Sequence, residues 1–325
     1  MRTIVYTEYG PPDVLQLLGV EKPVPGDDEV LIRVHAATVT AGDCEVRSFT
    51  FAAWLWLPLR IMMGVIKPKR QVLGQEIAGV IGAIGKDVTE FGVGDRVFAT
   101  CIRFGAYAEY LCLPSSGPIA IKPVNMSYEE AATIPTGAYN ALHFLKRAAI
   151  QSGEKILING AGGGIGVIAV QLARYLGAHV TAVDSAEKLD MLHEIGADRV
   201  IDYTQEDFTR NGETYDVIFD IHGKSPFTRC VQSLSENGRY ILGNPRLLPI
   251  LRGLWTSWTS SKKVIFAFAG VTAEVLDYVR QLIEAGEIKA IIDRVYPMEK
   301  IAEAHTYVET GRKKGNVVIL IRQDD

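Results

Sequence analysis

The stretch Lys155-Ile-Leu-Ile-Asn-Gly-Ala-Gly-Gly-Gly-Ile-Gly166 decides the fold. Lys155–Asn159 is a short apolar run between glycines, which predicts a buried parallel strand. Residues 167–176 carry apolar side chains at helical spacing, and Gly177 is a natural end for that helix. A second apolar run, residues 179–183, follows and is closed by Asp184. The order strand, turn, helix, strand predicts an α/β unit with a parallel sheet.

The glycines of this turn point to a dinucleotide. Without side chains, the backbone can approach a pyrophosphate, and N–H groups at the helix N-terminus can donate to its oxygens. The spacing is Ala161-x-Gly163-x-x-Gly166, with alanine at the first position of the usual pattern. Asp184 lies 21 residues beyond Gly163, which is about where an acid binds the adenosine ribose. The alternative is a glycine-rich turn with no ligand.

Length and composition limit the remaining possibilities. A chain of 325 residues favours two domains, and its 34 basic and 38 acidic residues argue against a nucleic-acid partner. The four cysteines are scattered without a C-x-x-C pair, which argues against disulfides and a zinc knuckle. Met1 leads directly into an expected strand at Thr3–Tyr6, so we expect no signal peptide and a cytoplasmic protein.

The pattern changes near Ser127. Before it, short strands separated by turns predict a compact barrel-like domain, with strands at 30–35, 77–84 and 96–99. After it, helices alternate with strands, and a final strand at Asn316–Ile321 is expected to return to the first domain. We therefore expect one domain from residues 1–125 plus 295–325, and a nucleotide-binding domain from residues 126–294.

Five further motifs occur in order along the chain: Tyr9-Gly-Pro-Pro-Asp-Val-Leu15, Gly74-Gln-Glu-Ile-Ala-Gly79, Val93-Gly-Asp-Arg-Val97, Gly105-Ala-Tyr-Ala-Glu-Tyr110 and Gly196-Ala-Asp-Arg-Val-Ile-Asp-Tyr203. With these motifs and the glycine turn, the chain resembles the medium-chain dehydrogenase/reductase superfamily, in its zinc-free quinone-oxidoreductase branch. The resemblance runs nearly end to end. It implies a Rossmann-type, doubly wound parallel sheet domain and a chaperonin-10-like, β-rich, partly open barrel that carries the catalytic residues.

The zinc enzymes of this superfamily hold a catalytic metal at three positions, which correspond here to Thr40, Gln75 and Ala132. None of these is a competent zinc ligand, and the region of the structural zinc contains only Cys101 and Cys112. We therefore predict no metal. An enzyme without a Lewis acid is better suited to an acceptor that is already activated, such as a conjugated enone or a quinone, than to an alcohol.

The resemblance also implies the cofactor site. Gly163, Gly164, Ile165 and Gly166 are expected at the pyrophosphate, and His222 near the nicotinamide, although a loop residue without such a role is the alternative. The residues expected around the adenosine ribose are Asp184, Ser185, Lys188 and Tyr203. A carboxylate repels a 2′-phosphate but accepts from a 2′-hydroxyl, so Asp184 favours NADH over NADPH. Lys188 could still bind NADPH, and the alternative for it is an exposed helix residue.

Three residues are candidates for catalysis: Thr40, Asp43 and Tyr139. The turn Thr40-Ala-Gly-Asp43 corresponds to the family segment that lines the nicotinamide pocket. Asp43 is interpreted mainly as an anchor of this turn. Tyr139 is a candidate wall or donor, with a core position as the alternative. For Cys44 we expect packing rather than reactivity.

Two apolar stretches, residues 49–66 and 247–258, stand out. Pro58, Arg60 and Gly64 interrupt the first, which argues against a membrane span. The favoured interpretation is a lid over a lipophilic substrate, followed by an oligomer or interdomain contact. Membrane docking, helped by Lys67, Lys69 and Arg70, is a third interpretation that is not favoured.

Together these observations predict a zinc-independent NAD(P)H-dependent oxidoreductase that transfers hydride to an apolar enone or quinone. The alternatives are an alcohol or aldehyde dehydrogenase, and a non-catalytic NAD(P)H-binding sensor or adaptor. Members of this branch commonly form homodimers through the last sheet strand, which is expected here at Val264–Phe268.

Overall fold

The computed structural model describes residues 1–244 and 246–322. The chain forms two compact units. The first contains Met1–Thr136, Val271–Ala285 and the residues from Ala290 onward, and the second contains Gly137–Gly270 and Gly286–Lys289. This grouping adds residues 126–136, 271–285 and 290–294 to the first unit, where α3 (Tyr128–Ala132) packs on its sheet and α9 (Ala273–Glu284) packs on its strand β7 (Ile119–Ile121). The predicted domain boundaries therefore stay a prediction.

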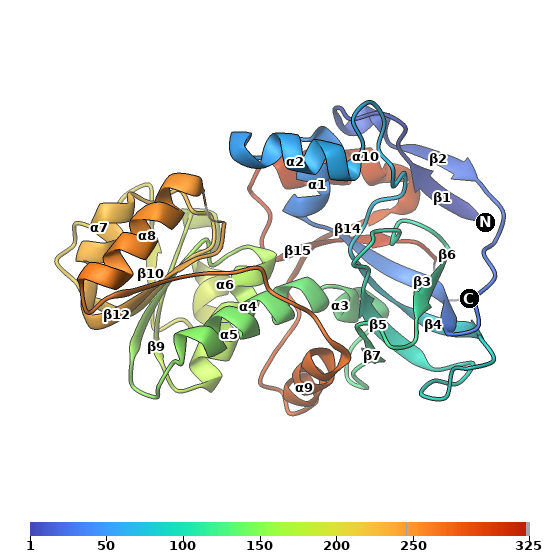
Figure 1. Cartoon of the computed structure of the whole chain (residues 1–325). Coiled ribbons are helices and arrows are strands. Elements are labelled where there is room, and N and C mark those ends of the chain that lie inside the picture. Colours follow the sequence, from blue (N-terminus) through green and yellow to red (C-terminus); the bar gives the residue numbers. More distant parts are fainter. Residues whose placement is uncertain (245, 323–325) are drawn as a thin grey trace. The chain divides into compact units, whose positions relative to one another are not determined.

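The second unit is built on a six-stranded sheet in which every strand is parallel to its neighbours (Figure 1). Its order is β10 (Arg199–Asp202), β9 (His179–Asp184), β8 (Lys155–Asn159), β11 (Tyr215–Asp220), β12 (Leu234–Leu242) and β13 (Lys263–Phe266). The direction of winding reverses between β8 and β11. Ligands of such sheets bind beyond the carboxyl ends of the strands at this reversal. The predicted doubly wound parallel sheet is confirmed.

The helices of this unit are α4 (Pro135–Ala148), whose first two residues belong to the first unit, α5 (Gly164–Tyr175), η2 (Ala186–Lys188), α6 (Leu189–Glu194), α7 (Phe227–Gln232) and α8 (Leu247–Thr259). The helix expected from residue 167 begins at Gly164, because the last glycines of the turn already form its first turn. The last strand is shorter than predicted. It ends at Phe266, which pairs with Leu242, the final residue of β12, so no ladder partner remains for Phe268.

The first unit contains a two-stranded sheet, β1 (Arg2–Val5) with β2 (Gln16–Gly19), and a seven-stranded sheet. The larger sheet runs β14 (Ile292–Pro297), β15 (Asn316–Leu320), β3 (Glu29–Val39), β4 (Glu76–Ile84), β5 (Arg96–Thr100) and β7 (Ile119–Ile121), and β6 (Tyr110–Pro114) also pairs with β3. β3 has three partners along its eleven residues and two irregularities of register, which let it bend. As predicted, the C-terminal strand returns to this sheet.

The helices of the first unit are η1 (Pro12–Val14), α1 (Ala41–Ser48), α2 (Ala53–Met63), α3 (Tyr128–Ala132), α9 (Ala273–Glu284), η3 (Met298–Lys300) and α10 (Ile301–Glu309). α1 contacts α10, and buried side chains from both helices join the core under β3 and β4. Within the described residues, no helix combines the length and the apolar character that crossing a membrane requires.

Candidate active site

The glycine turn lies between the end of β8 and the N-terminus of α5. Gly163 is the N-cap, and the first bond within the helix runs from the Val167 N–H to the Gly163 carbonyl, at 2.9 Å. The N–H groups of residues 164–166 therefore have no carbonyl partner inside the helix. They lie at the positive end of the helix dipole, which favours an anion.

The glycines of this turn differ in what a side chain would meet. A Cβ on Gly166 would lie 2.4 Å from the Ala161 carbonyl oxygen, and one on Gly162 would lie 2.4 Å from Cδ of Lys188. The fold itself therefore requires Gly166, whose neighbours are backbone atoms, whereas at Gly162 the side chains of Lys188 and Asp184 would have to shift. A Cβ on Gly163 would meet no atom closer than 3.7 Å. The protein therefore leaves room at Gly163, beside the N–H groups that lack a partner within the helix, where the backbone can approach an anionic group such as a pyrophosphate.

Asp184, the last residue of β9, is tied to this turn. Its Oδ2 accepts from the Gly162 N–H at 2.8 Å, and its Oδ1 accepts from the Ser185 N–H at 2.9 Å. Nζ of Lys188 lies 2.9 Å from Oδ1, and both side chains are buried. The alternative that Lys188 is an exposed helix residue is therefore wrong. A carboxylate oxygen accepts about two hydrogen bonds, so Oδ2 keeps capacity for a ribose hydroxyl.

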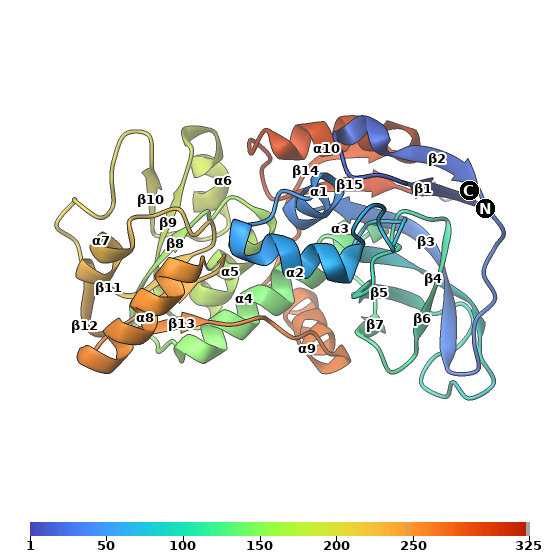
Figure 2. The ribbon, with the colours of Figure 1, turned by 45° about the horizontal axis from the view of Figure 1, so that its top comes forward.

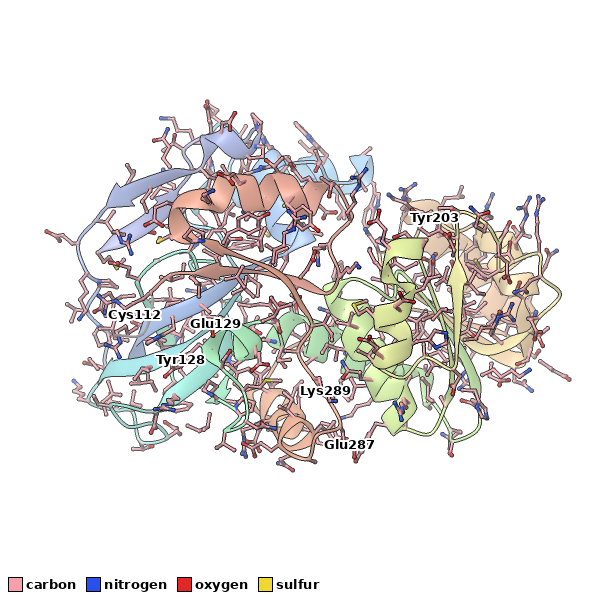
Figure 3. The ribbon with its side chains drawn as sticks, turned by 180° about the vertical axis from the view of Figure 1, so that it is seen from behind. Cys112, Tyr128, Glu129, Tyr203, Glu287 and Lys289 are labelled. Atoms are coloured by element: carbon pink, nitrogen blue, oxygen red, sulfur yellow. The ribbon has the colours of Figure 1, made fainter. Side chains whose placement is uncertain are left out.

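The remaining residues predicted around the cofactor lie at strand ends of the same sheet. Tyr203 follows β10, its N–H donates to the Asp184 carbonyl at 3.2 Å, and its side chain is 61% exposed (Figure 3). His222 follows β11 and is also exposed, and its ring would lie 2.6 Å from a Cβ on Gly160. The structure thus gathers Asp184, Ser185, Lys188 and Tyr203 at the ends of β9 and β10. Their roles in binding stay predictions.

Asp220 was not singled out from the sequence. It is the last residue of β11 and is fully buried. Its Oδ1 accepts from Nδ2 of Asn159 at 2.9 Å and from the Gly223 N–H at 3.1 Å, and its Oδ2 accepts from the Tyr240 hydroxyl at 3.0 Å. These bonds fix the loop that carries His222. The signal for it is an acid at the carboxyl end of a predicted strand, the same feature that identified Asp184.

In the first unit, Thr40 and Asp43 form a capping box at the start of α1. The Thr40 hydroxyl donates to Oδ2 of Asp43 at 2.7 Å and accepts from the Asp43 N–H at 3.1 Å, while Oδ1 of Asp43 accepts from the Gly74 N–H at 3.2 Å. Asp43 is completely buried, and this burial raises the pKa of its carboxyl against the effect of its hydrogen bonds. This geometry suits a positioning role for Asp43. A part for Asp43 in catalysis stays a prediction.

The three positions that hold zinc in the metalloenzymes do not fit the metal here. Nε2 of Gln75 donates to the Thr40 hydroxyl at 3.2 Å, so this hydroxyl already makes three hydrogen bonds. Ala132 offers no side-chain donor atom. In residues 1–244 and 246–322, no three His, Cys, Asp or Glu side chains are grouped so that they could hold a metal ion.

Glu76 was also missed. Its side chain is 1% exposed, and it accepts hydrogen bonds from the Thr38 hydroxyl and, at 2.5 Å, from the Thr136 N–H. Burial raises the pKa of Glu76 to about 7. Its carboxylate thereby connects two strands of the first unit to Thr136, the last residue of that unit before the second begins. The sequence shows Glu76 inside a family motif but gives no sign that it is buried.

Tyr139 and Cys44 complete the predicted set. Tyr139 is half-buried in α4. Cys44 is buried with its Sγ 3.4 Å from Nδ1 of His305, and burial raises the pKa of its thiol to about 12. A thiol that stays protonated at neutral pH is a poor nucleophile. The packing role expected for Cys44 agrees with this environment.

Comparison with known proteins assigns the chain to a family. Residues 26–123 match the model of the alcohol dehydrogenase GroES-like domain, and residues 195–319 match a model described as zinc-binding dehydrogenase. A 2-methylene-furan-3-one reductase from Solanum lycopersicum is 32% identical, over 98% of this chain and 79% of its own. This chain belongs to the medium-chain dehydrogenase/reductase superfamily, in its quinone-oxidoreductase-like branch. The resemblance found in the sequence is therefore confirmed.

Other members of the superfamily extend this similarity over the whole chain. The quinone oxidoreductase of Homo sapiens is 29% identical, over 99% of this chain and 98% of its own. Among solved structures, the quinone oxidoreductase from Coxiella burnetii superimposes with a TM-score of 0.87 at 27% identity and covers 99% of both chains. Both units of the fold are thus those of the superfamily.

Replacing Gly163 with alanine tests the ligand space in front of the turn. Because the protein leaves this position open, Gly163→Ala should cost about 1 kcal/mol of stability or less, as expected for an N-cap. The dissociation constant for the cofactor should rise roughly tenfold or more. Gly166→Ala is the matched control, and its clash should lower stability by about 1–3 kcal/mol. Thermal unfolding and fluorescence titration measure both effects, and unchanged cofactor affinity in Gly163→Ala would contradict the assignment.

Glu76 should make stability depend on pH. The folded pKa of about 7 exceeds the ordinary value of 4.5, so the folded state holds this proton more tightly than the unfolded chain does. Stability from this group is therefore present below pH 4.5 and is lost as pH rises through 7, by up to about 3 kcal/mol. Glu76→Gln imitates the protonated form and should flatten this part of the profile. Urea unfolding between pH 5 and 8 gives the comparison, and identical profiles for both proteins would rule out the effect.

Proposed function

We propose that this protein is an NAD(P)H-dependent oxidoreductase that transfers hydride to an activated acceptor, an enone or a quinone. The observation that carries the proposal is the open space at Gly163 beside the free N–H groups of α5. The relatives named 2-methylene-furan-3-one reductase and quinone oxidoreductase support the choice of acceptor. The bound nicotinamide supplies the hydride, and the protein contributes position and electrostatics.

The residues of the two units divide this work. The N–H groups of residues 164–166 bind the pyrophosphate, and Oδ2 of Asp184 accepts from a ribose hydroxyl. Thr40 lines the pocket in the first unit, where Asp43 and Gln75 fix its hydroxyl. Because Thr40 already donates its proton to Asp43, it is a poor proton donor to substrate. Tyr139, the other predicted hydroxyl, is our candidate for that role on the strength of the sequence resemblance.

The reaction is proposed to be independent of zinc. The alternative of an alcohol or aldehyde dehydrogenase needs a group that lowers the pKa of an alcohol, and Thr40, Gln75 and Ala132 provide no ligand set for a metal that would do so. An apolar substrate is supported by α2, which continues from α1 and exposes Leu57, Ile61 and Met62. The lid role of α2 and the cytoplasmic location stay predictions.

Turnover without metal is the direct test of the function. The purified protein should reduce methyl vinyl ketone or 1,4-benzoquinone with NADH or NADPH, and kcat/KM should be unchanged after exhaustive treatment with a chelator. Zinc bound in stoichiometric amount by elemental analysis would refute the metal-free mechanism. Tight cofactor binding without turnover of any enone or quinone would instead support the nucleotide sensor.

For the cofactor, we propose a preference for NADH. We expect the carboxylate of Asp184 to face the adenosine ribose, where it would repel the 2′-phosphate of NADPH and accept from the 2′-hydroxyl of NADH. Lys188 weakens this repulsion because its ammonium group pairs with Oδ1 of Asp184. The preference should therefore be moderate and should depend on both residues.

Variants of Asp184 and Lys188 measure this preference. Asp184→Ser removes the negative charge and releases Lys188, so the ratio of kcat/KM for NADPH to that for NADH should rise roughly tenfold or more. Adding Lys188→Ala should abolish most of this gain. Asp190→Ser, which removes an exposed acid from neighbouring α6, is the control and should leave the ratio unchanged. An unchanged ratio in Asp184→Ser would mean that its carboxylate does not face the ribose.

We further propose a homodimer in which β13 pairs with its twofold copy. β13 is the edge strand of the parallel sheet, and its residues Val264, Ile265 and Phe266 are half-buried within one chain. An apolar edge strand offers unpaired N–H and C=O groups that a second copy can satisfy. Isologous pairing would extend the two sheets into one.

Placing proline in β13 tests this pairing. Ile265→Pro removes a ladder donor and should convert the dimer into a monomer or an aggregate, as measured by light scattering. Proline at Val24, an exposed position far from the sheet in sequence, serves as a control for general effects of proline. A wild-type mass equal to one chain at micromolar concentration, without aggregation, would exclude the dimer.

A further inference from the structure

α8 carries most of its large apolar side chains on the face that is exposed to solvent. Six of them are between 48% and 79% exposed: Leu247, Leu248, Leu251, Leu254, Trp255 and Trp258. At about 100° per residue, these six lie within an arc of roughly 120° on one side of the helix. We call this surface the α8 stripe. A surface helix normally turns such a stripe toward the core.

The opposite face of α8 is the one that packs on the sheet. Figure 2 shows α8 beside β13. Gly253 is buried there, and a Cβ on it would lie 2.7 Å from Cγ1 of Val264. The hydroxyl of Ser257 accepts from the Val264 N–H at 2.9 Å. Because small and polar residues make these contacts, the packing of the unit does not account for the stripe.

A second observation concerns charge. Residues 237–273 contain no acidic residue, although about four would be expected from the 38 in the whole chain. Arg246, Arg252 and Lys263 are exposed around α8 and form no ion pair with any described carboxylate. Apolar side chains with a rim of unpaired positive charge match the chemistry of an anionic lipid surface.

We propose that α8 docks this protein onto the surface of a bilayer that contains anionic lipid. A helix of 13 residues is about 20 Å long, which is less than the roughly 30 Å of hydrocarbon in a bilayer, so it would lie in the plane of the interface. Trp255 and Trp258, with ring centroids 5.7 Å apart, are suited to the headgroup region. A second copy of the chain is a less suitable occupant, because two faces of the same positive charge would repel.

The depression between α7 and α8 is consistent with this exposed position. It has a volume of about 630 Å³, and its walls include Phe227 and Val231 from α7 and Leu251 and Trp255 from α8. α7 therefore stands beside the stripe without covering it.

α2 differs from α8 in how its apolar residues are held. The guanidinium of Arg60 lies 4.2 Å from the ring centroid of Tyr9 and 4.5 Å from that of Phe49. The ring of Trp56 also contacts Phe49. These contacts attach Arg60 and Trp56 of α2 to aromatic residues of its own unit, although Leu57, Ile61 and Met62 stay exposed, so the proposal is made for α8 and the tryptophan variants below separate the two helices. It goes beyond the proposed reaction and does not depend on turnover.

Vesicle flotation tests the docking with the full-length protein. The protein should float with phosphatidylcholine vesicles that contain about 30 mol% phosphatidylglycerol, and should bind neutral vesicles roughly tenfold or more weakly. Binding should weaken strongly near 1 M salt, where the Debye length falls to about 3 Å. No flotation with the anionic vesicles would overturn the proposal.

Two matched variants locate the contact. Leu251→Ser/Leu254→Ser/Trp258→Ser removes three residues of the α8 stripe and should weaken vesicle binding roughly tenfold or more. Val24→Ser/Val93→Ser/Val124→Ser removes three isolated exposed side chains and should bind like the wild type. Thermal unfolding and cofactor binding should be retained in both. Equal vesicle binding by the two variants would overturn the proposal. It would also be overturned if no form bound vesicles and only the α8 variant had a lower molecular mass in solution than the wild type, because the stripe would then be a contact between copies of the chain.

Tryptophan fluorescence gives an independent readout, because the chain has four tryptophans and two of them lie in the stripe. Trp54→Phe/Trp56→Phe leaves Trp255 and Trp258 as reporters, which should shift to the blue on anionic vesicles and be quenched by brominated lipid. Trp255→Phe/Trp258→Phe leaves the α2 tryptophans and should show little change. A larger shift in the second variant would place the contact on α2 and overturn the assignment to α8.

Discussion

The hydrogen bond from the Gly162 N–H to Asp184, at 2.8 Å, is the interaction on which the nucleotide site depends. It holds the glycine turn against the end of β9, and it thereby fixes the first turn of α5 with its free N–H groups outward. Lys188 supports the arrangement by pairing with the same carboxylate. A charged acceptor makes a stronger hydrogen bond with a backbone N–H than a neutral one, so a single buried carboxylate can order a glycine-rich turn.

Two further buried carboxylates act in the same way. Asp220 fixes the loop after β11 through bonds to Asn159, Gly223 and Tyr240. In the first unit, Asp43 fixes the turn at Thr40. In each case an acid replaces water as the partner of backbone or hydroxyl donors that would otherwise be buried without one. These acids position the residues proposed to contact cofactor and substrate, and they do not themselves face solvent.

α8 differs from the core of the second unit in where its apolar residues lie. The core of the second unit buries apolar residues between helices and sheet, and Leu157, Val183 and Ile218 are almost inaccessible. α8 meets the sheet with Gly253 and Ser257 and exposes leucine and tryptophan. Exposed apolar surface costs free energy in water, so a continuous stripe of it marks a surface that is covered by something else. Because residues 237–273 contain no acidic residue, an anionic surface is a more suitable partner for this stripe than a cationic one.

The sequence by itself determined the architecture and the location of the cofactor turn. Apolar runs of strand length, helical spacing and glycines at fixed intervals are local features, and they predicted β8, α5 and β9 almost as found. The tertiary structure decided what depends on distant residues. Only folding shows that Lys188 pairs with Asp184 in a buried position, that Glu76 lies between Thr38 and Thr136, and that α8 faces its apolar side outward. The reason is physical: spacing along the chain fixes which residues share a face, whereas burial, pKa and the direction of that face depend on neighbours that the chain brings in from elsewhere.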